Sequence, residues 1–303
     1  MFSVLSALWP VFALLMIGFA GRKSGFPGDG FWEPAEKLTY FVLFPVLLVS
    51  KLSTADMAGI AFDDIALAIS VLLVVGSVLC LCLKPIMHLS SAAFTSFYQG
   101  AIRFNTYVAL AVATAIFGED AIALSAIVVA LMIPLINLLC VLVFSIHIPS
   151  GKGVSGFLRT LVKNPLILAC ILGIGLNVSG VGLHAELLSV AQLLGQMALP
   201  LGLLAVGAGL NIASLRSAQS AMWLSGIIKL LLFPLFMLFF AQWMELSPLV
   251  TGLLVVFSAV PTAPSGYILA RQLGGDAQMM AAIITGQTVL SILTLPLVLW
   301  LAL

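Results

Sequence analysis

The chain has 303 residues, of which 62% are hydrophobic and only 8% are charged. A soluble domain of this length carries roughly 25% charged residues, so lipid rather than water must cover most of this protein. Ten spans of about 20 apolar residues would use roughly 200 residues, and no soluble domain fits into the short connectors that remain. The net charge of +1 indicates no particular partner, and no basic patch suggests nucleic acid, so none is expected.

Apolar runs between charged or Gly/Pro-rich breaks predict ten membrane-spanning helices. The first run is preceded by no positive charge and followed by Arg22 and Lys23. This is the reverse of a signal peptide, so the run is expected to remain as a span. The predicted spans cover residues 4–20, 38–52, 65–83, 94–117, 121–146, 165–180, 187–210, 220–243, 247–270 and 277–302.

Positive charge is divided unevenly between the connectors. Only Lys51 falls in an even-numbered connector, and Arg103 and Lys229 lie within spans. Because positive residues collect on the cytoplasmic side, both termini are expected on the outer face. The odd-numbered connectors hold the remaining nine: Arg22, Lys23, Lys37, Lys84, Lys152, Arg159, Lys163, Arg216 and Arg271.

Proline and polar markers recur about half a chain apart, which indicates an internal repeat. The pairs are Pro45 with Pro200, Asn105 with Pro261, and Pro134 with Pro296. Each half, 1–150 and 151–303, then holds five spans, and an odd number of spans forces the halves into opposite orientations. Such inverted repeats are typical of secondary transporters, whose broken helices meet at the substrate site. Chance spacing in a proline-rich bundle is the alternative.

The fourth span contains an arginine and a polar triplet at membrane depth. A buried guanidinium is costly there, and no Asp or Glu lies within any predicted span to pair with Arg103. An anionic substrate would supply the counter-charge; alternatively, Arg103 reaches the cytoplasmic interface or contacts backbone carbonyls. Asn105, Thr106 and Tyr107 also need polar partners, from a substrate, a facing broken helix or their own helix.

The ninth span carries Pro261, Thr262, Ala263, Pro264 and Ser265 in succession. Two prolines three positions apart remove backbone donors and predict a broken helix, with a simple kink as the alternative. Unwound backbone at membrane depth is tolerated where it lines a cavity. Beyond the break, free N–H groups and the positive end of a half-helix are expected to face an anion.

Other polar residues within spans have less specific patterns. Lys229 could add positive potential to a cavity or reach the interface. Gln287, Ser291 and Thr294 share one face of the tenth span, where they either border the site or bond to neighbouring helices. The four cysteines match no zinc or redox spacing, and neither a metal site nor a cofactor is expected.

The Arg103–Tyr107 and Pro261–Pro264 segments, together with the ten-span plan, resemble the auxin efflux carrier family, which includes plant PIN proteins and bacterial malonate-transporter-like members. The resemblance covers essentially the full chain, without the long cytoplasmic loop of many plant members. It implies an elevator in which spans 1, 2, 6 and 7 form a scaffold and spans 3–5 with 8–10 move. It also implies a homodimer, and the short connectors favour a bacterial inner membrane.

These observations predict a carrier of a small organic anion, malonate-like or auxin-like. The expected substrate-binding residues are Arg103, Asn105, Thr106, Tyr107, Pro261, Thr262, Ala263, Pro264, Ser265 and Gln287. Coupling to H⁺ or Na⁺, or uniport, stays open. An enzyme is not expected, since paired aspartates, HExxH and a Ser/His pair at membrane depth are absent from the sequence. A channel-like pore, a sensor, or a carrier of a neutral or cationic solute are the alternatives.

Overall fold

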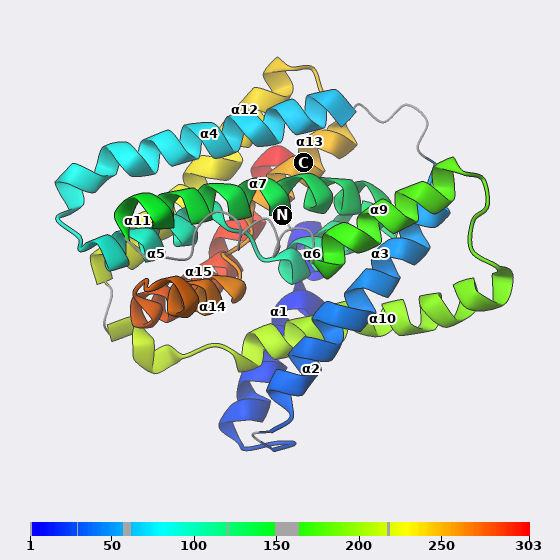
Figure 1. Ribbon diagram of the computed structural model, residues 1–303, viewed down its shortest axis with the longest axis horizontal. Coiled ribbons are helices and arrows are strands. Elements are labelled where there is room, and N and C mark those ends of the chain that lie inside the picture. The colour runs from blue at the N-terminus through cyan, green and yellow to red at the C-terminus, as the bar shows by residue number, and fades with distance from the viewer. Residues whose placement is uncertain (1, 29, 57–61, 120, 149–163, 217–218) are drawn as a thin grey trace.

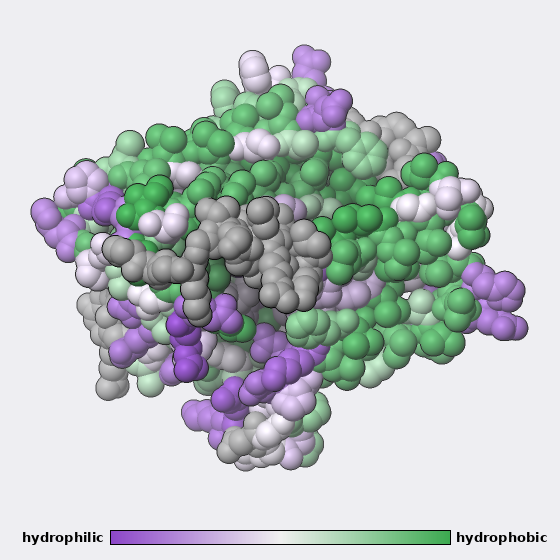
Figure 2. Space-filling view, viewed as in Figure 1, coloured by the Kyte–Doolittle hydropathy of each residue, from purple (hydrophilic) through white to green (hydrophobic). Residues whose placement is uncertain are grey.

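In the computed structural model, the described residues are 2–28, 30–56, 62–119, 121–148, 164–216 and 219–303. Every regular element within these ranges is helical. Seven helical segments there are long and apolar enough to cross a membrane, and two shorter apolar helices accompany them. Hydrophobic residues cover most of the visible face, and polar residues gather toward its edges (Figure 2). The chain is therefore an all-α integral membrane protein, as its composition predicts.

Each predicted apolar run coincides with one helix or with consecutive helices (Figure 1). In the first half these are α1 (Phe2–Lys23), α2 (Trp32–Leu38), η1 (Thr39–Leu43), α3 (Phe44–Ser53), α4 (Phe62–Met87), α5 (Ser91–Ile102), α6 (Thr106–Phe117) and α7 (Ala121–His147). In the second half they are α9 (Pro165–Val178), α10 (Ala185–Ala208), α11 (Gln219–Ile227), η3 (Ile228–Leu232), α12 (Phe233–Trp243), α13 (Pro248–Ala259), α14 (Ser265–Leu273) and α15 (Ala277–Ala302). The short helix η2 (Ile212–Arg216) lies in the connector between the seventh and eighth runs.

The second predicted span differs most from the structure, because its helix begins at Trp32 rather than at residue 38. The additional turns contain good helix formers. Lys37 also donates a 2.7 Å hydrogen bond to Glu33 one turn earlier, an i, i+4 pair that supports a helix in water. The helix therefore extends beyond the apolar run into its polar flank.

Two helices contain a π-helical turn directly before a Phe-Pro pair. The turn η1 precedes Pro45 and the turn η3 precedes Pro234. A proline ring clashes with the carbonyl four residues earlier and leaves it without an N–H partner. A wider turn accommodates both effects, so these prolines distort their helices without ending them.

Helices α1, α3, α9 and α10 pack through direct backbone contact. A Cβ added at Gly18 would collide with the carbonyl of Leu204, and one added at Gly207 with that of Leu15. On α9, a Cβ at Gly173 would lie 2.8 Å from the Cβ of Leu52. Small residues allow helix backbones to approach closely in lipid, so these four helices form one tightly joined group.

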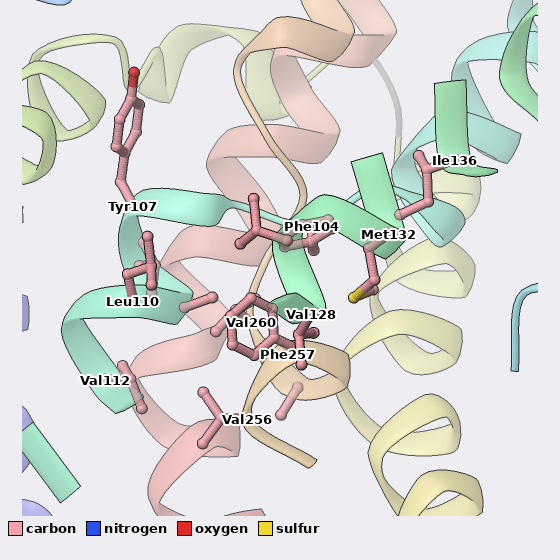
Figure 3. Packing of buried hydrophobic residues seen from close by; sticks show 14 of the residues in the cluster. Phe104, Tyr107, Leu110, Val112, Val128, Met132, Ile136, Val256, Phe257 and Val260 are labelled. Atoms are coloured by element: carbon pink, nitrogen blue, oxygen red, sulfur yellow. The ribbon is translucent and has the colours of Figure 1, made fainter. Parts of the chain in front are cut away.

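The other helices surround the two helix pairs α5–α6 and α13–α14. Helix α15 contacts α5, α11, α13 and α14, and α7 contacts α4, α5 and α6. Around the junctions of the two pairs lies a dense apolar cluster that includes Phe104, Phe257 and Val260 (Figure 3). The predicted boundary between residues 150 and 151, and the positive residues Lys152, Arg159 and Lys163, lie outside the described residues.

Candidate functional site

Two helices break where the sequence predicts and cross each other at their breaks. Helix α5 ends at Ile102 and α6 begins at Thr106, while α13 ends at Ala259 and α14 begins at Ser265. At the crossing, the backbone N–H of Asn105 donates a 2.8 Å hydrogen bond to the carbonyl of Pro261. The alternative of a simple kink at the prolines is therefore wrong, because five residues separate α13 from α14.

Each break has a local cause in the sequence. Pro261 and Pro264 provide no backbone N–H and cannot continue α13. In the other helix, the side-chain oxygen of Asn105 accepts hydrogen bonds from the N–H groups of Tyr107 (3.1 Å) and Val108 (3.3 Å). Asparagine is a preferred N-cap residue, so it starts α6 as a new helix.

Gln287 on α15 braces both breaks at once. Its side-chain oxygen accepts a 2.9 Å hydrogen bond from the N–H of Thr262, and its amide nitrogen donates a 2.9 Å bond to the carbonyl of Gly100. The hydroxyl of Thr262 donates to the carbonyl of Gln99 at 3.3 Å. Gln287 is fully buried and already bonded, so it positions the breaks.

Arg103 lies at the centre of the crossing and is held by neutral groups. Its Nε donates to Gln99 (3.0 Å), its Nη1 to Ser265 (3.2 Å) and its Nη2 to Asn137 (2.8 Å). Only 7% of the residue is exposed, so neighbouring helices enclose the guanidinium almost completely. In the described part of the chain, no carboxylate lies within ion-pair distance of the guanidinium.

Two buried amide groups at the crossing retain unused donors. The Nε2 of Gln99 and the Nδ2 of Asn105 have no hydrogen-bond partner. The orientation of both amides is fixed, since each oxygen already accepts: Gln99 from Arg103, and Asn105 from the first turn of α6. A buried unsatisfied donor costs free energy. Together with the guanidinium, these donors make the crossing suited to an acceptor-rich, negatively charged ligand.

Tyr107 lies at the contact between the crossing and the tightly packed helix group. Its ring packs against Phe44 of α3 with centroids 4.6 Å apart, and a Cβ added at Gly202 of α10 would lie 2.8 Å from it. The ring is directed away from Phe104 and Val260 (Figure 3). Tyr107 therefore faces α3 and α10, while Phe104 packs against Phe257 on the apolar side of the crossing.

The remaining predicted site residues line the same two breaks with different exposure. Thr106, Ala263 and Pro264 are half-buried, Pro261 and Thr262 are buried, and Ser265 is exposed. Several backbone N–H groups at the two helix starts already have partners. Asn105 caps α6, and Gly266 and Tyr267 of α14 donate to the carbonyls of Ala263 and Pro264. That free N–H groups beyond the breaks face an anion stays a prediction.

Sequence reasoning missed Gln99 and Asn137, although both are amides inside apolar helices, which is itself a signal of function. Lys229 is buried and donates to the carbonyl of Phe257 at 3.4 Å. Ser291 bonds to the carbonyl of Thr288 in its own helix. The hydroxyl of Thr294 is buried without a partner.

Comparisons with known proteins point to membrane transporters. A family model described as membrane transport protein matches residues 154–299, which include the break at Pro261–Pro264. An uncharacterized transporter of Methanothermobacter thermautotrophicus is 24% identical over 296 residues, covering 95% of this chain and 94% of the relative. Membrane transporters are generally not enzymes. The chain is thus similar to membrane transport proteins in its second half and to a transporter over most of its length, which supports a membrane transporter.

Proposed function

We propose that the protein is a secondary transporter of a small organic anion, malonate-like or auxin-like. One observation carries this proposal: a buried guanidinium with only neutral partners lies beside two unpaired amide donors at the crossing of two broken helices. A carboxylate would bond to these donors and neutralise Arg103. A cationic solute would meet a buried positive charge instead.

The proposed roles follow from the contacts. Arg103, Asn105 and Thr106 bind the carboxylate, and Tyr107 closes the side that faces α3 and α10. On the opposing break, Pro261, Thr262, Ala263, Pro264 and Ser265 shape the other wall, and Gln287 holds both breaks in register. Non-helical backbone at membrane depth is tolerated only inside the protein or around a cavity, so a broken helix is a suitable place for a substrate to bind.

The proposed architecture is ten spans in two inverted five-span repeats, with halves 1–150 and 151–303. Spans 1, 2, 6 and 7 would form a fixed scaffold, and spans 3–5 and 8–10 would carry the substrate past it. The glycine contacts that join α1 to α10 and α3 to α9 support the scaffold assignment, because backbones in direct contact leave no room to slide. Tyr107 against Gly202 lies at the proposed sliding surface.

The protein is further proposed to act as a homodimer in a bacterial inner membrane, with both termini outside. Support for the orientation comes from the uneven distribution of Lys and Arg between connectors. Among the described residues, no acid pairs with Arg103. Coupling of transport to H⁺, coupling to Na⁺, and uniport driven by the membrane potential are therefore tested separately.

The proposal is tested with purified protein in liposomes. Uptake of radiolabelled malonate and a panel of mono- and dicarboxylates is followed under imposed potentials, with and without pH and sodium gradients. Saturable uptake that changes with potential is the expected result. If no carboxylate enters while a neutral or cationic solute does, the proposed substrate class is wrong although the protein remains a transporter.

A further inference from the structure

A pocket with polar and charged lining residues lies apart from the crossing and includes none of the crossing's residues. Its volume is about 340 Å³, and it is enclosed by the end of α3, the start of α7 and the middle of α10. Lys51 and Glu119 contribute the charged groups, and Gln192 and Gln196 contribute amides from one face of α10. The pocket is therefore lined by both the proposed scaffold and the proposed moving bundle.

The charged groups of this pocket pair with each other across the two bundles. The Nζ of Lys51 donates to Oε2 of Glu119 at 2.7 Å. The side chain of Lys51 is 31% exposed and that of Glu119 is 68% exposed. An ion pair with so much water contact contributes little net stability, so another carboxylate can replace Glu119 at little cost.

The position of Lys51 in the charge pattern is unusual. It is the single Lys or Arg that the sequence places in an even-numbered connector, on the face predicted to be outside. Ile122, in the first turn of α7, also lines the pocket, so the positive end of that helix dipole lies nearby. A lone cation retained on this face, inside a pocket rather than on open surface, indicates a binding role.

We infer that this pocket is a second anion site, in which Lys51 binds the carboxylate of the transported anion at the outer face and Glu119 is the internal counter-ion that the anion displaces. The inference rests on the proposed transport of organic anions. Gln192 and Gln196 donate to the second polar group of the anion. Binding opens the Lys51–Glu119 contact between the bundles, and release of the anion restores it.

The test compares right-side-out with inside-out vesicles from the same cells, so that labelled carboxylate is presented to one face at a time. Lys51→Gln is expected to raise the half-saturation concentration about tenfold, which equals about 1.4 kcal/mol. Glu119→Gln frees Lys51 and is expected to lower that concentration severalfold. Both effects appear only when the anion meets the Lys51 face. Lys37→Gln is the control: it removes an exposed 2.7 Å ion pair elsewhere and is expected to leave the half-saturation concentration unchanged in both vesicle types.

A purely structural ion pair predicts the opposite pattern. Both single variants would then shift the half-saturation concentration in the same direction, and the charge-reversed pair of Lys51→Glu with Glu119→Lys would restore wild-type values. Either result would overturn the inference, as would equal shifts in both vesicle types. The reversed pair also retains an ion pair and so controls for misfolding. If wild-type protein takes up no carboxylate in either vesicle type, the proposed function itself fails.

Discussion

At the scale of single residues, the crossing is defined by an excess of hydrogen-bond donors. Arg103 uses three N–H groups on Gln99, Asn137 and Ser265, while the amide nitrogens of Gln99 and Asn105 remain unpaired. Unpaired buried donors are rare in folded proteins because each costs free energy. Two such donors beside one guanidinium support the proposed anion site.

The variant Asn105→Asp separates the capping of α6 by this side chain from its proposed contact with the anion. An aspartate keeps the oxygen that caps α6, so the helix start is retained. The variant loses the unpaired donor and adds a negative charge beside the proposed carboxylate site. We expect anion uptake to fall at least about tenfold, equal to about 1.4 kcal/mol, with little change in thermal unfolding temperature. Wild-type uptake by a folded variant would show that the site lies elsewhere.

At the scale of helices, close backbone contacts and polar braces hold the elements in place. Glycines join α1 to α10, and the amide of Asn177 on α9 donates to the carbonyls of Leu52 and Ala55 at the end of α3. Gln287 connects α15 to both breaks. The contacts of Gln287 hold the two breaks, and the donors beside them, in a defined arrangement.

Gly207→Ala tests the α1–α10 contact. The added methyl would collide with the carbonyl of Leu15, and forcing an extra carbon into a packed site costs about 1–3 kcal/mol. We expect a lower unfolding temperature in detergent. Gly175→Ala is the matched control, because a Cβ there meets nothing within 4 Å. Equal unfolding temperatures for the two variants would contradict the close contact.

Glu36 on α2, just before the second predicted span, gives a pH-dependent contribution to stability. Burial raises the pKa of its carboxyl, with a smaller effect from the charge of Glu33. A carboxyl whose pKa is higher in the folded than in the unfolded state binds its proton more readily when folded, so its stabilising contribution grows as pH falls through that raised pKa. Glu36→Gln should lose this gain as the pH falls from neutral into the acidic range, measured by thermal unfolding.

Glu33→Gln is the control for this measurement. The bond and charge of Lys37 lower the pKa of Glu33, so its contribution runs in the opposite direction with pH. Since burial is the larger cause for Glu36, the Glu33 variant should retain most of the gain at low pH. If only the Glu33 variant lost the stability gained at low pH, that gain would come from Glu33 and the assignment to Glu36 would be wrong.

At the scale of the whole molecule, much of the arrangement could be predicted because lipid imposes simple rules. Apolar runs locate the helices, and Pro261, Pro264 and the polar segment after Arg103 locate both breaks. The partners of Arg103 could not be predicted, since Ser265 is 162 positions away and meets it only once the helices cross. The role of Asn105 as a cap likewise depends on where α6 begins, which an apolar pattern does not reveal.

Whether the molecule is a carrier with its site at the crossing is the central claim, and counterflow tests it most directly. Liposomes containing wild-type protein or the Asn105→Asp variant are loaded with unlabelled malonate and then diluted into labelled malonate. The account predicts that internal malonate accelerates saturable uptake by wild-type protein, and that the variant loses this acceleration. Uptake that rises linearly with concentration, ignores internal malonate and is equal in the two proteins would instead indicate a pore and contradict the account.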